Sequence, residues 1–186
     1  QLPLPLLLYN MPSHTKLSFA VETVRRVAEL PGVVGLKDSS ADMIYFQQLL
    51  ALFQDRSDFT LLVGPEQLLA EAVLLGGHGG INGGANFHPR LYVQLYEAAR
   101  TRDFDRMALL QSQVMRIGSG LYRIGRFGSS YLKGLKCALS LLGLCDDFLA
   151  EPFHRFEPAE RIRVQRELVE LGLLHGPDDA VNRRGE

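Results

Sequence analysis

The sequence predicts an α/β fold in which short parallel strands alternate with helices. Apolar runs end at or just before Tyr9, Lys37 and Gly64, and residues with helical spacing follow each of them. Tyr9 and Lys37 lie 28 positions apart, and Lys37 and Gly64 lie 27 positions apart. Both spacings are close to the roughly 30 residues of one strand–helix unit. Repeated units of this kind indicate a parallel sheet with right-handed crossovers.

Local patterns then predict each element in order. A continuous apolar run is typical of a parallel strand with both faces covered, and helical periodicity is interrupted at glycine and proline. The expected strands are 4–9, 33–37, 59–63 and a compact one within 76–84, and the expected helices are 19–28, 44–53, 67–75, 89–100, 104–122, 131–142 and 158–173. Residues 10–12 are expected to form a turn. Such a sheet can be open and doubly wound or closed as a (β/α)8 barrel. Four units are too few for the barrel, which needs eight strands and about 250 residues.

Composition excludes several classes of function. The 186 residues carry a net charge of −1, so no electrostatic footprint for nucleic acid is expected. No apolar run approaches the roughly 18 residues of a membrane span. The two cysteines, Cys137 and Cys145, do not form a disulfide scaffold, and we expect them reduced in a cytoplasmic protein. The chain does not begin with methionine, and we expect it to be a fragment.

Lys37 is the first candidate for chemistry, because it alone among the four lysines ends an apolar strand. An ammonium at the end of a buried strand is partly desolvated, which disfavours its charged form. A neutral amine can attack a ketone and form a Schiff base. The alternative is a lysine whose side chain merely extends from the strand end into solvent.

Tyr9 ends the preceding strand, so its phenol is expected on the same rim as Lys37. Ligands of parallel α/β sheets bind at the carboxyl ends of the strands, and a phenol there can transfer protons or hold a carboxylate. The glycine-rich passage 76–84 either binds an anion through backbone N–H groups or lets its strand approach its neighbours closely.

Other catalytic patterns are missing from the sequence. Five scattered histidines with no i, i+4 pair argue against a metal site. There is no G-x-S-x-G nucleophile elbow, P-loop or dinucleotide fingerprint. No metal or organic cofactor is therefore expected.

Three segments together resemble a known family. They are Tyr9-Asn10-Met11-Pro12-Ser13-His14-Thr15, Gly35-Leu36-Lys37-Asp38-Ser39-Ser40, and Gly76-Gly77-His78-Gly79-Gly80-Ile81 through Ala85-Asn86. In this order and spacing they resemble the dihydrodipicolinate synthase/N-acetylneuraminate lyase family of class I, pyruvate-type aldolases. The resemblance runs from the first residues to about Leu171. It implies that the chain is the C-terminal half of a (β/α)8 barrel, with strands five to eight and a C-terminal helical extension.

This resemblance also implies a domain organisation. Residues 1–102 would form the last four strand–helix units and residues 103–175 the helical extension. Residues 176–186 have almost no apolar content, and for that reason we expect them to be a disordered tail. The family's Gly-Thr-Thr segment, which completes the carboxylate pocket and the proton relay, would belong to the other half of the barrel. A homotetramer is likewise implied only by the family.

Site residues follow position by position from the resemblance. Lys37 matches the Schiff-base lysine and Tyr9 the tyrosine that relays protons and contacts substrate. The expected substrate-binding positions are Ser39, Gly64, Ile81, Glu66, Gln67 and His14. Among them, Ser39 is a hydroxyl near the substrate, Gly64 and Ile81 line its carboxylate end, and Glu66 and Gln67 contact its hydroxyls.

Two departures guide the choice of substrate. His14 stands where dihydrodipicolinate synthases typically have a carboxylate-binding arginine. Glu66-Gln67 and Gly83 stand where sialic-acid lyases tend to have an aspartate–glutamate pair and a serine. The preferred interpretation is a Schiff-base lyase, aldolase or dehydratase acting on pyruvate or a 2-oxo acid, such as a 2-keto-3-deoxy sugar acid.

Other interpretations stay open. The parent could be a dihydrodipicolinate synthase proper or an N-acetylneuraminate lyase, and this chain is expected to be inactive alone. From a different class, the chain could be a non-enzymatic truncated half-barrel or binding module. Its terminal strands would then expose edges that barrel closure removes.

Overall fold

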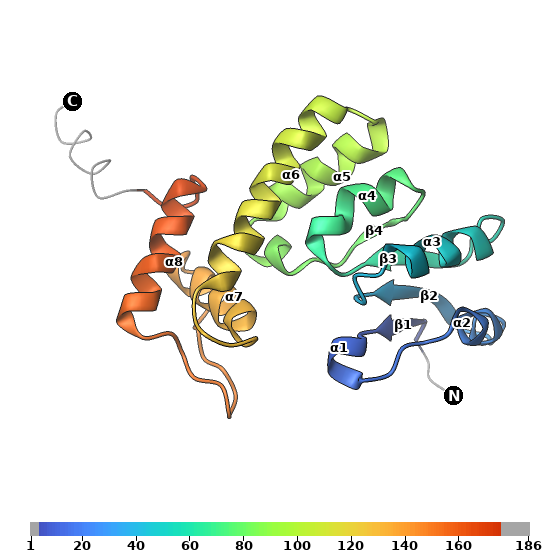
Figure 1. The fold of residues 1–186 in the computed structure, drawn as a ribbon, viewed down its shortest axis with the longest axis horizontal. Helices are drawn as coiled ribbons and strands as arrows, with labels where there is room; N and C mark the ends of the chain where they lie inside the picture. Colours follow the sequence, from blue (N-terminus) through green and yellow to red (C-terminus); the bar gives the residue numbers. More distant parts are fainter. Residues whose placement is uncertain (1–3, 176–186) are drawn as a thin grey trace. The chain divides into compact units, whose positions relative to one another are not determined.

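A computed structural model describes residues 4–175, and it contains one parallel sheet. The strands are β1 (Leu6–Asn10), β2 (Val33–Asp38), β3 (Thr60–Val63) and β4 (Gly79–Gly80), in the order β1-β2-β3-β4 (Figure 1). The order in the sheet is the order in the sequence. Right-handed crossovers between such strands place successive helices on one face, whereas a doubly wound sheet reverses its strand order. The topology is therefore that of consecutive units of a barrel.

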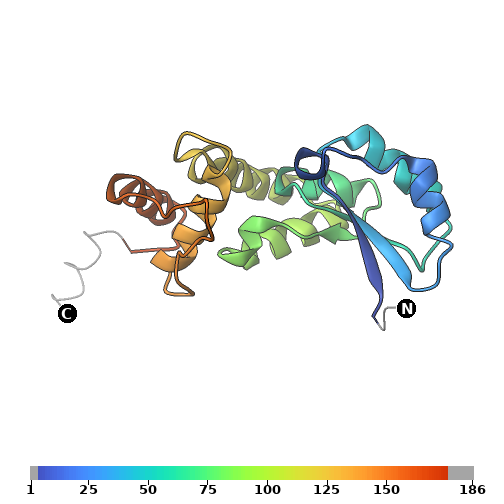
Figure 2. The ribbon, with the colours of Figure 1, turned by 90° about the horizontal axis from the view of Figure 1, so that it is seen from below.

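The helices follow the strands in alternation and then continue alone. They are α1 (Pro12–Thr15), α2 (Val21–Val27), α3 (Met43–Leu52), η1 (Glu66–Leu68), α4 (Leu69–Leu74), η2 (Gly83–Asn86), α5 (Pro89–Thr101), α6 (Phe104–Ser119), η3 (Leu121–Arg123), α7 (Ser130–Leu141) and α8 (Pro158–Glu170). Figure 2 shows α2 and α3 on the same side of β1 and β2. The chain divides into two compact units, residues 1–83 with 92–111 and residues 84–91 with 112–186.

The core of the first unit lies between the sheet and its helices. Leu36 and Leu61 of neighbouring strands are 0% and 1% exposed, and Phe46 and Leu49 of α3 are both 0% exposed. The i, i+3 spacing of the last two gives α3 a buried stripe. Asp42 begins this helix, because its carboxylate accepts hydrogen bonds from the N–H groups of Ile44 and Tyr45.

This packing leads to a prediction about stability. We expect Phe46→Ala to lower the free energy of unfolding by about 3–5 kcal/mol, because it leaves a cavity under the sheet. Ile44 is 73% exposed on the same helix, so Ile44→Ala should change stability by less than about 0.5 kcal/mol. Denaturant unfolding of the full-length protein that contains this chain compares the two variants. Equal effects would contradict the placement of Phe46 in the core.

The expectation that both faces of the first strand are covered is wrong. Leu6, Leu7 and Tyr9 are 40%, 46% and 49% exposed. β1 lies at one end of the strand order, beside β2. Its continuous apolar run suits a strand whose second face lines the interior of a complete barrel.

Several boundaries differ from those expected. The first strand covers Leu6–Asn10 rather than 4–9. The turn expected at 10–12 is wrong, because Asn10 ends β1 and Pro12 begins α1, where a proline is suited to the first helical turn. The third expected helix begins with the 3₁₀ turn η1. The long helix expected over 104–122 ends at Ser119, because Gly120 weakens helix propagation. The last helix ends at Glu170.

The second unit is built around α7 and α8, which pack against each other. Val164 and Leu168 of α8 are 0% exposed. The Arg161 guanidinium donates to Asp147 at 2.8 Å and to Ser140 Oγ at 3.2 Å, so this arginine is hydrogen-bonded within the unit. Both cysteines are free, and burial raises the pKa of the Cys137 thiol. The proposed boundary at residue 102 stays a prediction, and the expected tail 176–186 lies outside the described residues.

Candidate active site at the carboxyl ends of the strands

Tyr9 and Lys37 lie opposite each other at the carboxyl ends of β1 and β2. The two residues are direct partners in the parallel register. The Lys37 Nζ atom lies over the face of the Tyr9 ring, 4.3 Å from its centroid. Lys37 is half-buried and Tyr9 is about half exposed. A cation at this distance from an aromatic face is attracted by about 0.5–1 kcal/mol at an exposed site.

Lys37 has no ion-pair partner in the part of the chain that the structure describes. Within residues 4–175, no carboxylate lies within salt-bridge distance of its Nζ atom. The amine of Lys37 instead projects over a ring on an open face of the sheet, where a small carbonyl compound can approach it.

Ser39 and Gly64 lie side by side just beyond β2 and β3. The Ser39 N–H donates to Asn10 O at 2.8 Å, and the Gly64 N–H donates to Asp38 O at 2.7 Å, so both residues extend the ladder past the strands. A Cβ atom built on Gly64 would overlap Ser39 Oγ. The lack of a side chain at Gly64 therefore creates the space that the Ser39 hydroxyl occupies.

This close approach leads to a second prediction. We expect Gly64→Ala to lower the free energy of unfolding by about 1–3 kcal/mol, because the methyl group overpacks against Ser39. Removing the hydroxyl in Ser39→Ala/Gly64→Ala should restore part of the loss. Gly128 has open space where a Cβ would stand, so Gly128→Ala is the matched control. Denaturant unfolding measures all three variants, and a fully stable Gly64→Ala would contradict the packing.

Ile81 and Asn82 complete the rim after β4. The Ile81 N–H donates to Val63 O at 3.0 Å, and the Ile81 side chain is 50% exposed. Asn82 is 8% exposed and donates through Nδ2 to Gly64 O at 2.9 Å. Its amide thereby ties the last strand to the end of β3. Sequence reasoning did not single out Asn82, because a lone Asn in a glycine-rich passage looks like a turn residue.

Glu66, Gln67 and His14 make contacts of a different kind from those of the residues at the carboxyl ends of the strands. Glu66 is 3% exposed, and its carboxylate accepts a hydrogen bond of 2.8 Å from Tyr92 Oη. The backbone oxygen of Gln67 accepts from Gln111 Nε2 at 2.7 Å. His14 lies exposed on α1, where its Nδ1 atom is 3.1 Å from Ser13 Oγ. Their assignment to substrate contacts stays a prediction.

A buried polar pair was also missed by the sequence reasoning. Asn10 and Asp38 are 1% and 2% exposed, and Asn10 Nδ2 donates to Asp38 Oδ1 at 2.8 Å. Burial and then the negative charge of Asp38 raise the pKa of Tyr45 to about 12. Each member of the pair directly follows one of the two candidate catalytic residues, and this placement is the signal that could have revealed it.

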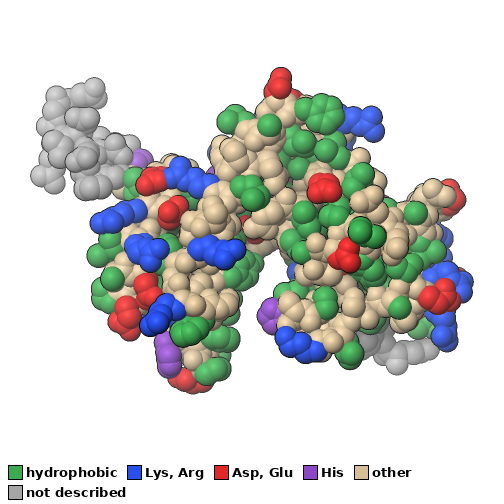
Figure 3. Space-filling model, viewed as in Figure 1, with side chains coloured by type: hydrophobic (Ala, Val, Ile, Leu, Met, Phe, Trp, Pro, Cys, Tyr) green, Lys and Arg blue, Asp and Glu red, His purple; other side chains and the backbone are tan. Residues whose placement is uncertain are grey.

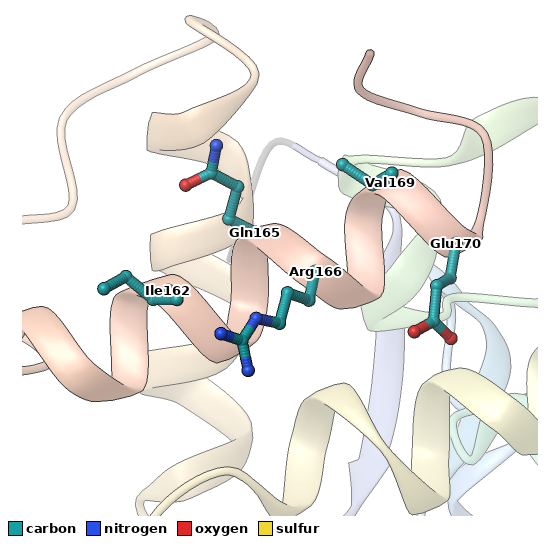
Figure 4. A pocket seen from close by; sticks show the side chains of 5 residues that line it. All are labelled: Ile162, Gln165, Arg166, Val169 and Glu170. Atoms are coloured by element: carbon teal, nitrogen blue, oxygen red, sulfur yellow. The ribbon is translucent and has the colours of Figure 1, made fainter. Parts of the chain in front are cut away.

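Two hollows lie away from these strand ends. One, of about 310 Å³, is bounded by side chains of α8 alone, namely Ile162, Gln165, Arg166, Val169 and Glu170 (Figure 4). The other, of about 360 Å³, lies near the amino ends of β3 and β4 and includes His78. Neither includes Tyr9 or Lys37.

The surface, the helices and the side chains give three further findings. Acidic and basic side chains are intermixed over the face shown in Figure 3. Over residues 4–175, no helix combines the length and the apolar character needed to cross a bilayer. The same part of the chain holds no group of three or more His, Cys, Asp or Glu side chains suited to a metal ion.

Comparison with known proteins identifies relatives over most of the chain. An uncharacterised DapA-like lyase of Halobacterium salinarum is 32% identical over 170 residues, which cover 91% of this chain and 53% of the relative. A 4-hydroxy-tetrahydrodipicolinate synthase of Methanopyrus kandleri is 31% identical, covering 91% of this chain and 55% of that protein. The chain thus spans about half the length of the curated relatives it matches.

A solved structure and a family model agree with this result. The dihydrodipicolinate synthase of Bacteroides thetaiotaomicron superposes with a TM-score of 0.87 at 57% identity, covering 91% of this chain and 57% of that one. The model of the dihydrodipicolinate synthetase family matches residues 1–171. The family match extends across the strand ends that carry Tyr9 and Lys37, and through the helices that follow the sheet. The chain belongs to the dihydrodipicolinate synthetase family.

Proposed function

We propose that the full-length protein is a Schiff-base-forming lyase or aldolase acting on pyruvate or another 2-oxo acid, with Lys37 as the nucleophile. The observation that carries this proposal is the Lys37 Nζ atom, which lies 4.3 Å above the Tyr9 ring. No carboxylate pairs with this amine among residues 4–175. Membership of the family supports the same reaction class.

The chemistry follows from the properties of an amine and a ketone. The neutral amine of Lys37 attacks the C2 carbonyl carbon, and loss of water leaves an iminium. The iminium withdraws electrons, so C3 loses a proton to give an enamine, which can attack an aldehyde carbon. In the reverse direction, the C3–C4 bond breaks and its electron pair enters the iminium. Hydrolysis of the imine releases the 2-oxo acid and regenerates Lys37.

Tyr9 has two roles in this scheme. Its hydroxyl carries protons to and from the reacting oxygen, as a positioned general acid and base. Its ring face lies against the nitrogen that becomes the iminium, and such a face attracts a cation. The steps use no metal ion or organic cofactor.

The remaining predicted residues would hold the substrate. The exposed Ile81 and the neighbouring Ser39 and Gly64 lie at the strand ends, where the carboxylate of a 2-oxo acid would bind. Glu66, Gln67 and His14 are proposed for the rest of the substrate. His14 in place of an arginine favours a 2-keto-3-deoxy sugar acid over the substrate of dihydrodipicolinate synthases.

We also propose that the four strands correspond to strands five to eight of a complete barrel. The sheet has four strands, and the relatives are almost twice as long as the matched segment. The exposed face of β1 would then line the barrel interior. Residues 1–102 and 103–175 would be the half-barrel and the extension, the isolated chain would be inactive, and the complete protein would be a homo-oligomer, with four subunits as in its family.

Sodium borohydride reduction in the presence of pyruvate tests this proposal. On the full-length protein, we expect the intact mass to increase by one reduced pyruvyl group per subunit. Assays of pyruvate release from 2-keto-3-deoxy sugar acids, and of pyruvate consumption with aldehydes, then determine the direction of the reaction. A full-length protein with unchanged mass and no turnover would support a non-enzymatic binding module instead.

A further inference from the structure

The helix-facing side of the candidate site contains the buried pair formed by Asn10 and Asp38. Asn10 follows Tyr9 on β1, and Asp38 follows Lys37 on β2, so the pair lies one position further along the same register. Both side chains are at least 98% buried, and a hydrogen bond of 2.8 Å joins them across the two strands. A buried side-chain bridge therefore links the strands directly beside the two candidate catalytic residues.

Asp38 also anchors the segment that follows β2. Its Oδ1 atom accepts the Ser40 N–H at 3.1 Å, and its Oδ2 atom accepts the Ser40 hydroxyl at 2.8 Å. With the bond from Asn10, three donors satisfy the buried carboxylate. A buried carboxylate without such donors would be costly, and these bonds therefore hold Asp38 in one orientation.

Asn10 anchors the segment that returns from α1 in the same way. Its Oδ1 atom accepts the Phe19 N–H at 3.1 Å and the Ser18 hydroxyl at 3.3 Å. The amide nitrogen donates to Asp38 while the amide oxygen accepts these two bonds. Both polar atoms of the side chain are thus used, so Asn10 has a single orientation that satisfies all of its partners.

The alternation of side chains along a strand connects this pair to the chemistry. Successive side chains point to opposite faces, so Asn10 and Asp38 face the helices while Tyr9 and Lys37 face the open side. Because the buried pair is held in place, the backbone positions from which Tyr9 and Lys37 project are held as well. A slip of one residue would turn Lys37 toward the wrong face.

We propose that Asn10 and Asp38 are positioning residues, which hold the Tyr9 hydroxyl and the Lys37 amine in reactive register. This inference rests on the proposed Schiff-base function. Neither residue touches the reacting atoms in this scheme. A displacement of about 1 Å at a reacting centre can cost on the order of 100-fold in rate, so a loss of the bridge has a large expected effect.

The experiment measures the rate of reductive pyruvate trapping in the full-length protein. Asn10→Ala removes the bridge, and we expect trapping to slow by about 10- to 100-fold. In a Tyr9→Phe background the same substitution should slow trapping by a clearly smaller factor, since the part of the loss that comes from the displaced hydroxyl is already present and only the displacement of the Lys37 amine remains. Equal losses in both backgrounds, or no loss in either, would overturn the positioning role.

Asn10→Asp keeps the size of the side chain and makes the expected effect on trapping depend on pH. At about pH 8 it places two ionised carboxylates face to face, and near pH 5 one of them is protonated and can donate to the other. Trapping with cyanoborohydride should therefore approach the rate of the unmodified protein as pH falls. A deficit independent of pH would contradict the proposal. This variant also serves if Asn10→Ala fails to fold.

Three further variants separate a loss of positioning from a loss of stability. Asp38→Asn retains an oxygen for the Asn10 amide and the Ser40 N–H, so it should retain trapping within a few-fold, whereas Asp38→Ala should not. Ser130 is a 7% exposed polar residue of the second unit, and Ser130→Ala should leave trapping unchanged.

If the unmodified protein traps pyruvate on Lys37 but Asn10→Ala traps equally fast, only the positioning role fails. If the unmodified protein never traps pyruvate, both proposals fail.

Discussion

Lys37→Arg in the full-length protein is expected to lower the turnover of 2-oxo acids by about 10⁴-fold or more, and to abolish pyruvate trapping. An arginine retains the positive charge and the contact with the Tyr9 ring, but its guanidinium is not deprotonated in proteins. It therefore cannot form the imine, and removal of a nucleophile typically costs several orders of magnitude. Steady-state kinetics and reductive trapping measure the two effects.

Lys133 provides a matched control for this substitution. It is also half-buried, and its Nζ atom lies 4.8 Å from the centroid of the Phe156 ring. Lys133→Arg should therefore reproduce any loss due only to a disturbed contact between a lysine and an aromatic ring. We expect it to retain full turnover. Activity that survives in Lys37→Arg would exclude Lys37 as the nucleophile.

Tyr9→Phe is expected to lower kcat by about 10²- to 10⁴-fold, the usual contribution of a positioned general acid and base. The ring stays, so the contact with Lys37 is kept, and imine formation should be detectable although slower. Because Tyr9 is 49% exposed, loss of its hydroxyl should change the free energy of unfolding little. Steady-state kinetics should thus show a fall in kcat that is larger than any change in KM.

Tyr131 is the control for Tyr9. It is 43% exposed and packs edge-on against Tyr122 in the second unit. Tyr131→Phe removes a hydroxyl of similar exposure from outside the candidate site, and turnover should stay unchanged. A Tyr9→Phe enzyme with normal kcat would show that another group transfers the proton.

The sequence was sufficient to predict the juxtaposition of Tyr9 and Lys37. Both residues end apolar strands, and their separation of 28 positions matches one strand–helix unit. Parallel strands from consecutive units pair side by side, so equivalent positions meet in the register. The same separation applies to Asn10 and Asp38, and this pair could have been predicted by the argument already applied to its neighbours.

Other features of the fold and the site depend on tertiary packing, which local sequence patterns do not indicate. The burial of Glu66 depends on Tyr92, which lies 26 positions further along the chain, and no periodicity indicates that these two side chains meet. The exposure of β1 depends on which strands are present beside it. α1 has only four residues, too few for a helical period to be recognised.

The central claim is that the Lys37 amine bonds covalently to the keto carbon of a 2-oxo acid. Its most direct test is proteolysis of the full-length protein after borohydride reduction with pyruvate, followed by mass mapping of the modified peptide. We expect one carboxyethyl group per subunit, located on Lys37 and absent from Lys16, Lys133 and Lys136. An adduct located on any other residue, with Lys37 unmodified, would contradict it.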